Sequence, residues 1–380
     1  MFKHHELRLV EPAFGSTLTD LIIELDHLRK KRLAGTTHPR IFFQLKNIFH
    51  TLESIASARI EGNRTTIAEF IESKLEDKAN PDEKIIEIRN MEKAMDFIDK
   101  QIDSHPINRA FVSELHKIVA AGLSPDKEGD ATPGAYRSQN VKITNAAHTP
   151  PDVSQVQSYM ETLFSFIAQK HPSKYDLLKT AIAHHRFVWV HPFKNGNGRT
   201  VRLFTYAMLV HQGFNIKKGR IVNPAAVFCA DRDKYYEYLA KADEGSDQAI
   251  LLWCEYVLSG LKGEIEKIDR LLDYGYLSEK ILLPAIDVSL DRKIIIDSEA
   301  KILKIAIHKQ KFKAGDLTEL FPGKHASEIS RMLRLLKEKK MIVPDSPEAR
   351  SYFISFHNNY LLRGVITMLG KNGFLPVKDR

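Results

Sequence analysis

Residues 191–202 read His-Pro-Phe-Lys-Asn-Gly-Asn-Gly-Arg-Thr-Val-Arg, and the predictions for the rest of the chain start from this stretch. It is a polar turn between two apolar helical patterns, one ending near Val190 and one covering residues 199–212. Gly196 and Gly198 let the backbone approach a ligand closely. The unsatisfied N–H groups at the start of the second helix favour an anion, phosphate above all. We therefore expect a phosphate-binding loop here.

Three side chains around this turn are suited to group transfer. Arg199 and Arg202 are three residues apart, so they share a helix face and can both bind a polyphosphate. His191 precedes the turn, where an imidazole can accept a proton at neutral pH. A base, an anion site and two cations predict phosphoryl or nucleotidyl transfer. The alternative is an ordinary turn with a packed histidine and solvated arginines.

The run His191-Pro-Phe-x-x-Gly-Asn-Gly-Arg-x-x-Arg202 resembles the signature of Fic-domain proteins, and the resemblance covers roughly residues 1–270. Most members transfer AMP from ATP to a Ser, Thr or Tyr hydroxyl of a target protein. The resemblance implies that His191 deprotonates this hydroxyl and that Tyr236 lines the adenine pocket. It also implies that the phosphates of ATP are bound by Gly196, Asn197, Gly198, Arg199 and Arg202.

Two positions depart from the family pattern. Asn195 stands where the family usually has an Asp or Glu that helps to hold Mg²⁺. Asparagine offers Mg²⁺ only a neutral oxygen, so we expect weaker metal binding and either altered AMP transfer or another phosphate-ester reaction. Asp243 stands seven residues after Tyr236, where the family often has Asn, and a carboxylate cannot donate to adenine.

The segment from Ser57 to Gly62 places a carboxylate at the end of a helix. Ser57 and Glu61 are four residues apart and face the same way on a helix, and Glu61 is in the last turn, where a carboxylate needs a cation. The alternative is a solvated Glu61. The segment resembles the family's inhibitory motif, which implies that Glu61 pairs with Arg202 and blocks the productive position of the outer phosphates.

We expect a mainly α fold, a Fic-like helical domain with a short β-hairpin flap over residues 134–151. Tyr136–Ile143 is the predicted strand of this flap, where the resemblance implies that the target protein docks by strand addition. Ser/Thr capping patterns predict helix starts at Thr66-Ile-Ala-Glu69 and Ser173-Lys-Tyr-Asp176. The predicted domains are an N-terminal helical region with the inhibitory helix, a catalytic core, a linker and a winged helix domain, at 1–100, 101–274, 275–296 and 297–380.

The C-terminal part has a different pattern. Three helices are predicted at 298–309, 314–320 and 325–340, followed by a two-strand hairpin, the order of a winged helix-turn-helix. Residues 297–380 contain 16 basic and 9 acidic side chains, a net charge of +7 out of +8 for the whole chain. The sequence leaves two roles possible for this domain, DNA binding and docking of another protein. The basic residues of the predicted recognition helix and wing are Arg331, Arg334, Lys337, Lys339, Lys340 and Arg350.

The composition excludes several classes of protein. The 380 residues are 43% hydrophobic and 27% charged, which is typical of a globular protein, and no apolar run is long enough to span a membrane. Cys229 and Cys254 exclude a disulfide framework. Without an apolar segment at the N-terminus, we expect a cytoplasmic protein with no membrane partner.

Three functions fit the sequence. The first is a self-inhibited protein adenylyltransferase that uses ATP and Mg²⁺ and modifies a target protein or itself. The second, suggested by Asn195, is phosphate transfer or another nucleotidyl transfer on the same scaffold. The third is a non-catalytic, nucleotide-sensing regulator that binds DNA through residues 297–380. We favour the first, and association as a homo-oligomer stays open.

Overall fold

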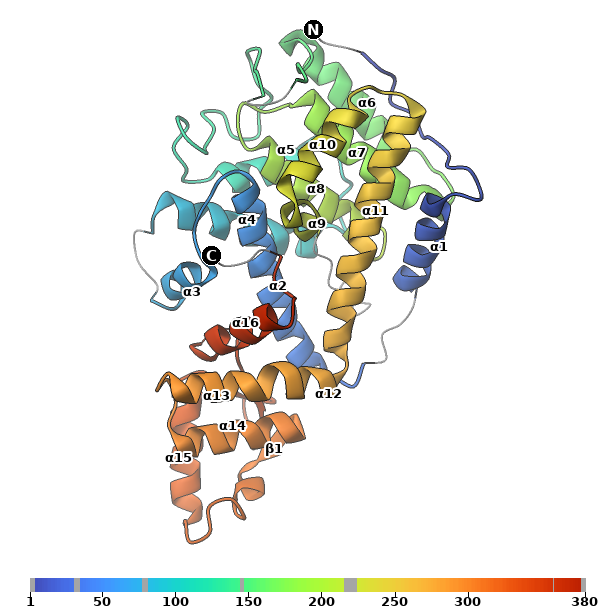
Figure 1. The fold of residues 1–380 in the computed structure, drawn as a ribbon. Coiled ribbons are helices and arrows are strands. Elements are labelled where there is room, and N and C mark those ends of the chain that lie inside the picture. The colour runs from blue at the N-terminus through green and yellow to red at the C-terminus, as the bar shows by residue number, and fades with distance from the viewer. Residues whose placement is uncertain are drawn as a thin grey trace. The chain divides into compact units, whose positions relative to one another are not determined.

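The computed structural model describes residues 4–30, 35–76, 81–143, 147–214, 224–357 and 359–376. They form two compact units. The first comprises the described residues within 1–33, 50–65 and 80–266, and the second those within 34–49, 66–79 and 267–380. Helices dominate both units (Figure 1), so the predicted mainly α fold class is confirmed.

The first unit is an assembly of helices without a described strand. Two short 3₁₀ helices, Val153–Gln155 and Ser173–Tyr175, lead into longer helices. Its helices are α1 (Thr17–Lys30), the C-terminal part of α2 (Pro39–Ile60), α4 (Glu83–Gln101), α5 (Arg109–Ala120), α6 (Val156–Ala168), α7 (Asp176–Val190), α8 (Asn197–His211), α9 (Pro224–Ala230), α10 (Arg232–Ala242) and most of α11 (Asp247–Asp269).

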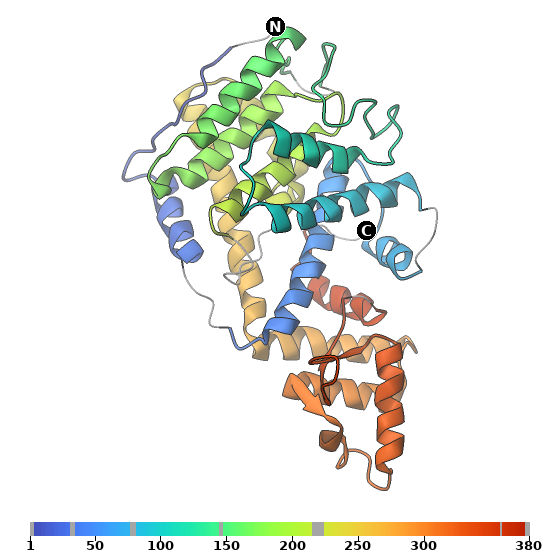
Figure 2. The same cartoon turned by 180° about the vertical axis from the view of Figure 1, so that it is seen from behind.

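Helix α8 lies at the centre of this unit. It packs against α4, α5, α7 and α9, and Figures 1 and 2 show α7 and α8 side by side. Nearly every residue of α8 is buried, which is typical of a helix surrounded by others. Leu203, Phe204 and Leu209 belong to the apolar cores on its different sides. Any charge that α8 carries is therefore buried as well.

One predicted capping pattern is confirmed and the other is wrong. Thr66 caps α3 (Ile67–Leu75) in a capping box, because its side chain accepts from the Glu69 N–H while its own N–H donates to the Glu69 carboxylate. Ser173 does not cap α7. Residues Ser173–Tyr175 form a 3₁₀ helix that continues directly into α7, so the start of α7 is not exposed to a serine side chain.

The flap differs from the prediction. Residues 144–146 lie outside the described part, and the described residues of 134–151 contain no strand, although Tyr136–Ile143 was predicted to be one. The buried side chain of Arg137 explains the difference. It donates to the carbonyl oxygens of Gln139 and Pro151 at 3.0 and 2.6 Å, so a side chain satisfies two backbone acceptors that in a strand ladder would accept from N–H groups.

Residues 275–296, the predicted linker, are mostly helical. They form a π-helical stretch, Leu277–Leu282, between two α-helices of the second unit, and buried Leu277 and Ile281 join its core. A 3₁₀ helix, Arg270–Leu272, comes just before them. The α-helices of this unit are the N-terminal part of α2, α3, α12 (Tyr274–Tyr276), α13 (Leu283–Asp291), α14 (Asp297–Lys309), α15 (Ala326–Glu338) and α16 (Leu361–Lys371).

A small antiparallel sheet follows α14. Its strands β1 (Lys311–Lys313), β2 (Ile342–Pro344) and β3 (Ser351–Ile354) lie in the order β1-β3-β2, with Phe312 opposite Tyr352 and Val343 opposite Phe353. The second predicted helix of this region is a short 3₁₀ helix, Ala314–Leu317. The order is thus the predicted one, with β1 added. Its identity as a winged helix stays a prediction.

No helix in the described part of the chain combines the length and apolar composition needed to cross a bilayer.

Candidate active site

His191 ends α7 in a left-handed conformation, with φ 51° and ψ 61°. Such a conformation is unfavourable for a residue with a side chain, by about 1–2 kcal/mol. Neighbouring bonds hold it: its N–H donates to the Phe187 carbonyl at 3.0 Å, and its carbonyl accepts from Arg137 Nε at 3.0 Å. Burial lowers the pKa of His191 to about 4, so its imidazole is neutral at pH 7 and able to accept a proton.

The loop from His191 to α8 is closed by Asn197. Its side-chain oxygen accepts from the Phe193 N–H at 2.9 Å, and its Nδ2 donates to the Phe193 carbonyl at 2.8 Å. The side chain of Asn197 therefore holds the loop, and only its backbone is available to a ligand. Gly196 precedes α8 with φ 72°, a conformation that glycine adopts without cost.

His116, on α5, packs against the loop and holds it in place. This residue was not predicted from the sequence as part of the site. Its ring stacks on Phe193 with centroids 3.7 Å apart. Nδ1 accepts from the Gly134 N–H at 2.8 Å, so Nε2 carries the proton and donates to the Asn195 carbonyl at 3.0 Å. Burial lowers the pKa of His116, which favours this neutral form. The sequence signal was available, since a histidine stands on the apolar face of a helix beside Val112 and Leu115.

Arg202 and the predicted inhibitory residues meet as the sequence indicated. Arg202 Nη2 donates to Glu61 Oε1 at 2.7 Å and to the Ser57 carbonyl at 3.0 Å, and Nε donates to Ser57 Oγ at 2.7 Å. Burial alone would raise the pKa of the Glu61 carboxyl, but the Arg202 guanidinium holds it below its usual value. Glu61 is therefore ionised at neutral pH, and all these bonds are charge-assisted.

Glu61 also lies directly against the start of α8. A Cβ atom on Gly198 would be only 2.0 Å from Glu61 Oε1. A Cβ atom at this position therefore fits only if the Glu61 carboxylate moves. Glu61 and Gly198 line the same groove, whereas Arg202, 1% exposed, does not reach it.

Arg199 is tied to two carboxylates. Its Nη1 lies 3.1 Å from Glu87 Oε1, and its Nη2 donates to the carboxylate and to the carbonyl of Glu128 at 2.9 and 2.7 Å. Neither glutamate was predicted. Glu87 is buried and also accepts from Asn63 Nδ2 at 2.7 Å, so it is a fixed partner of Arg199.

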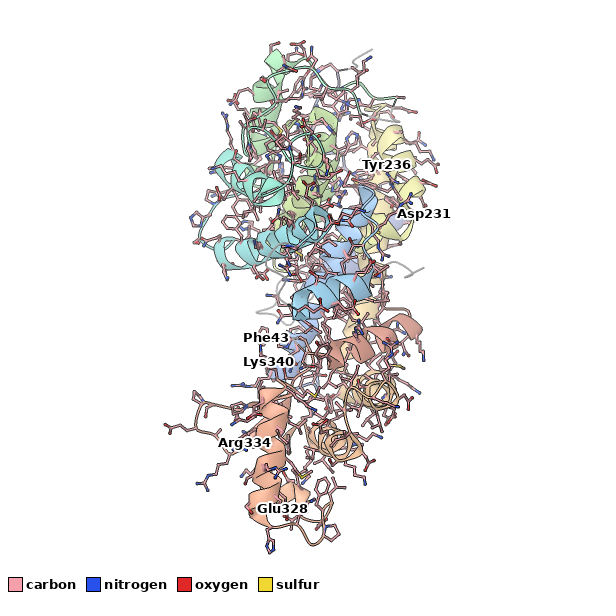
Figure 3. All side chains as sticks on the ribbon, turned by 90° about the vertical axis from the view of Figure 1, so that its left-hand side faces the viewer. Phe43, Asp231, Tyr236, Glu328, Arg334 and Lys340 are labelled. Atoms are coloured by element: carbon pink, nitrogen blue, oxygen red, sulfur yellow. The ribbon has the colours of Figure 1, made fainter. Side chains whose placement is uncertain are left out.

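The groove in front of α8 has a volume of about 760 Å³, ample for a nucleotide. Of the predicted site residues, it brings together His191, the turn from Asn195 to Arg199, Glu61 and Tyr236, while Ser57 and Arg202 lie behind. Tyr236, on α10, is 41% exposed, and Figure 3 shows it on the surface of that helix. Asp243 also lines the groove, but its Oδ1 is 2.9 Å from His185 Nε2. Asp243 is thus already paired with a histidine.

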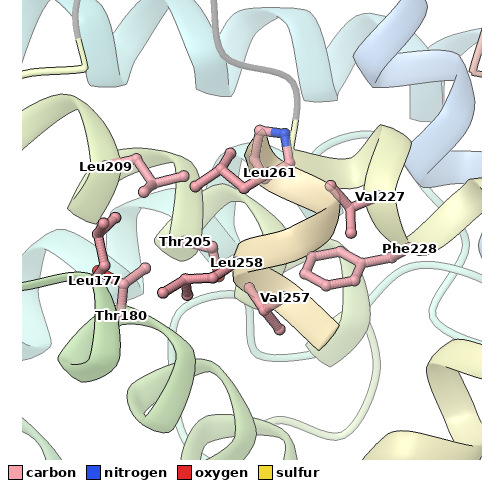
Figure 4. Close-up of a pocket in the computed structure, with 10 residues that line it drawn as sticks. Leu177, Thr180, Thr205, Leu209, Val227, Phe228, Val257, Leu258 and Leu261 are labelled. Atoms are coloured by element: carbon pink, nitrogen blue, oxygen red, sulfur yellow. The ribbon is translucent and has the colours of Figure 1, made fainter. Parts of the chain in front are cut away.

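A second cavity is part of the core. Figure 4 shows ten residues around it, including Thr205, Phe228 and Leu258, on α8, α9 and α11. Its volume of about 10 Å³ is no larger than one water molecule, and its lining exposes no polar surface. It has no room for a substrate.

The position of Glu61 can be tested through Gly198. We expect G198A to lower the melting temperature by several degrees in the wild-type chain, because the new methyl group overlaps the Glu61 carboxylate. In an E61G background, the same substitution should leave the melting temperature nearly unchanged. A thermal double-mutant cycle measures this coupling. Gly263, in helix α11 with no atom within 4 Å of its Cβ position, provides the control G263A. An equal loss in both backgrounds would contradict the geometry.

Comparison with known proteins agrees with this arrangement. Residues 106–209 match the family model described as Fic/DOC family. The chain is 29% identical over 198 residues to a protein named protein adenylyltransferase Fic from Nematostella vectensis, and 30% identical over 212 residues to one from Aedes aegypti. These matches cover 50% and 53% of this chain but 42% and 37% of the relatives, so the chain spans about two fifths of their length.

Solved structures share the fold. A crystal structure of a Fic family protein from Desulfovibrio desulfuricans G20 superposes with a TM-score of 0.54 at 21% identity, covering 93% of this chain and 98% of the other. A Fic domain containing signaling protein from Bacteroides thetaiotaomicron gives 0.52 at 16% identity, over 66% and 96%. These two structures show that the chain has the fold of Fic proteins, and residues 106–209 are the part that matches the Fic/DOC family model.

Proposed function

We propose that this chain is a protein adenylyltransferase, which moves AMP from ATP to a Ser, Thr or Tyr hydroxyl of a target protein or of itself. The observation that carries the proposal is the single groove lined by His191, by the first turn of α8 and by Tyr236. The names of the Nematostella and Aedes relatives support the same reaction.

The residues of the groove account for each part of this reaction. The N–H groups of the first turn of α8 bind the phosphates, helped by the helix dipole. Neutral His191 takes the proton of the attacking hydroxyl. The hydroxyl oxygen then bonds to the α-phosphorus, the bond from that phosphorus to the bridging oxygen breaks, and pyrophosphate leaves. The left-handed end of α7 fixes the imidazole beside the anion site, so little reorganisation is needed.

The flap is the proposed binding surface for the target protein. Residues 138–143 are exposed or half-buried, and their backbone forms no ladder with any described strand. An extended segment of a target protein can therefore add to this backbone and bring its hydroxyl to His191. Hydrogen bonds from Arg137 hold the base of the flap beside the His191 carbonyl.

We further propose that Glu61 inhibits the enzyme. Its carboxylate neutralises Arg202 and lies against Gly198, where the outer phosphates of ATP would pass. Like charges repel at this distance, so ATP can take its productive position only when Glu61 moves away. The 27% exposure of the Glu61 side chain toward the groove leaves room for that movement.

Removing the inhibitory carboxylate should activate the protein. We expect E61G to add AMP to itself or to a target at least tenfold faster than the wild type, and E61G/H191A to be inactive. Intact-mass spectrometry after incubation with ATP and Mg²⁺ measures both. The half-buried His171, which does not line the groove, provides the control E61G/H171A, which should stay active. A phosphate-sized adduct would favour phosphate transfer instead, and an unchanged rate in E61G would refute inhibition by Glu61.

The pH dependence should reflect the buried base. Burial lowers the pKa of His191 from 6.5 to about 4, so the neutral base persists as the pH falls until it nears 4. We therefore expect the rate of E61G to stay nearly constant from pH 7.5 down to about 5.5. Single-turnover rates across this range, with circular dichroism to verify folding, provide the measurement. A rate that halves near pH 6.5 would mean that His191 is not the base or is not desolvated.

A second candidate function, DNA binding, comes from helix α15. Buried Ile329, Leu333 and Leu336 face the core, and the exposed side carries Arg331, Arg334 and Lys337. Figure 3 shows Arg334 projecting from this helix. Among the described residues, no ion pair reaches Arg331 or Lys337. Free cations on one face of a helix that precedes a β-hairpin suit the phosphates of DNA, and such a protein would be a regulator that senses nucleotide and binds DNA.

The salt dependence of DNA binding tests this candidate. For the full chain with random duplex DNA, we expect R331A/K337A to weaken binding at least tenfold and to reduce the slope of log K against log salt by about 2. Lys301 and Lys304 on α14 are paired with Asp297 and Asp287, so K301A/K304A is a control with the same change in charge. Equal effects of the two double mutants, or no binding at low salt, would refute an interface on α15.

A further inference from the structure

The side-chain amide of Asn195 points at a cluster of backbone carbonyls. Its Nδ2 donates to the carbonyl oxygens of Gly129 and Lys127 at 2.8 and 3.2 Å, and the Pro125 oxygen lies 3.5 Å away. Asn195 stands inside the signature loop, whereas these carbonyls belong to residues 124–129, which follow α5. One side chain thus joins two loops that both line the groove.

The loop 124–129 is a tight turn whose carbonyls are aimed at the signature. The Ser124 carbonyl accepts from the N–H groups of Lys127 and Gly129 at 3.0 and 2.8 Å. A Cβ atom on Gly129 would be 2.2 Å from the Leu123 carbonyl, so this position requires glycine. The carbonyl between the two bound by Asn195, that of Glu128, accepts from Arg199. Two donors of the signature therefore hold three successive carbonyls.

Only a donor fits the position that the Asn195 amide nitrogen occupies. An ionised aspartate has no N–H and would place a negative oxygen about 3 Å from two or three carbonyl oxygens. That arrangement is repulsive unless a cation lies between them. Asparagine removes both the repulsion and the reason for a cation.

The other acidic residues of the groove do not replace the missing metal ligand. Glu61, Glu128 and Asp243 are paired with Arg202, Arg199 and His185. The fourth acidic residue of the lining, Asp233, is a single carboxylate on α10, far fewer oxygens than the six that Mg²⁺ requires. The described residues contain no group of three or more His, Cys, Asp or Glu that could hold a metal ion. The residues present therefore do not fit a Mg²⁺ ion held by the protein, contrary to the cofactor predicted from the family resemblance.

We propose that Asn195 is a positioning residue that closes the loop 124–129 against the signature loop, and that the groove binds nucleotide phosphates without a divalent ion. The proposal of metal-free phosphate binding rests on the proposed function, whereas the positioning role of Asn195 does not. Positive charge comes from lysines that line the groove instead. Lys194 and Lys127 stand on the two loops that Asn195 joins, so closing the loop places both cations at the same groove.

Hydrogen exchange tests the loop directly, without nucleotide. We expect N195A and N195D to speed amide exchange in a peptide covering residues 124–130 at least tenfold, while a peptide from α6 is unchanged. Mg²⁺ alone should not slow exchange of this loop in the wild type. Unchanged exchange in N195A would overturn the positioning role. Slowing by Mg²⁺ in the wild type would show that a metal holds the loop and would overturn it as well.

Calorimetric binding of ATP tests the metal requirement, with E61G as the parent so that inhibition does not interfere. We expect the affinity of E61G for ATP in EDTA to lie within threefold of that in Mg²⁺. In EDTA, E61G/N195D should bind ATP at least tenfold more weakly than E61G does, because the added negative charge repels the phosphates when no cation is present. A purely structural role of Asn195 would not make the affinity for ATP depend on Mg²⁺ in this way. A tenfold requirement for Mg²⁺ in E61G would overturn metal-independent binding. Failure of E61G to bind ATP in either condition would refute the proposed function and with it the metal proposal, leaving the loop to the exchange result.

Discussion

The ion pair between Arg202 and Glu61 is the interaction on which the arrangement of the site depends. Arg202 is on α8, a helix surrounded by others, so its guanidinium must find an anion inside the protein. An unpaired charge at such a depth costs several kcal/mol. Glu61 supplies the anion from 141 positions earlier in the chain, and Ser57 accepts from Nε and Nη2 of Arg202.

The two arginines of the signature are paired differently, and this difference separates structure from regulation. The Glu87 partner of Arg199 is 4% exposed and held by Asn63, so its carboxylate cannot leave without losing another bond. The Glu61 side chain is 27% exposed, and Arg202 is its only described hydrogen-bond partner. Of these two carboxylates, that of Glu61 has fewer bonds to lose, but its departure leaves Arg202 without an anion unless another one takes its place. In the proposed inhibition, release therefore needs a local movement of one side chain together with a replacement anion.

Much of the site could be predicted because its parts are close in sequence. The glycines, the histidine and both arginines stand within twelve residues, and the pairing of Glu61 with Arg202 follows from recognising two motifs. His116 and Glu87 could not be predicted in this way, because only tertiary packing brings them to the loop. The strand expected at Tyr136–Ile143 is absent, and Arg137, a side chain from within the segment, binds the Gln139 carbonyl of the segment and the Pro151 carbonyl beyond it. The helices at 275–296 were missed although Leu277, Ile281 and Leu282 repeat at helical spacing.

The contrast between the rigid loop and the exchangeable carboxylate explains how one short motif can serve both binding and control. Asn197 locks the loop to itself, and His116 supports it by stacking on Phe193. Because these bonds are internal to the protein, the loop keeps its geometry whether Glu61 is present or displaced. Electrostatic stabilisation is strongest where the donors need no reorganisation. The orientation of the backbone N–H groups at the start of α8 is therefore fixed by these bonds, and in the proposed function the Glu61 carboxylate is the group that moves when a phosphate binds.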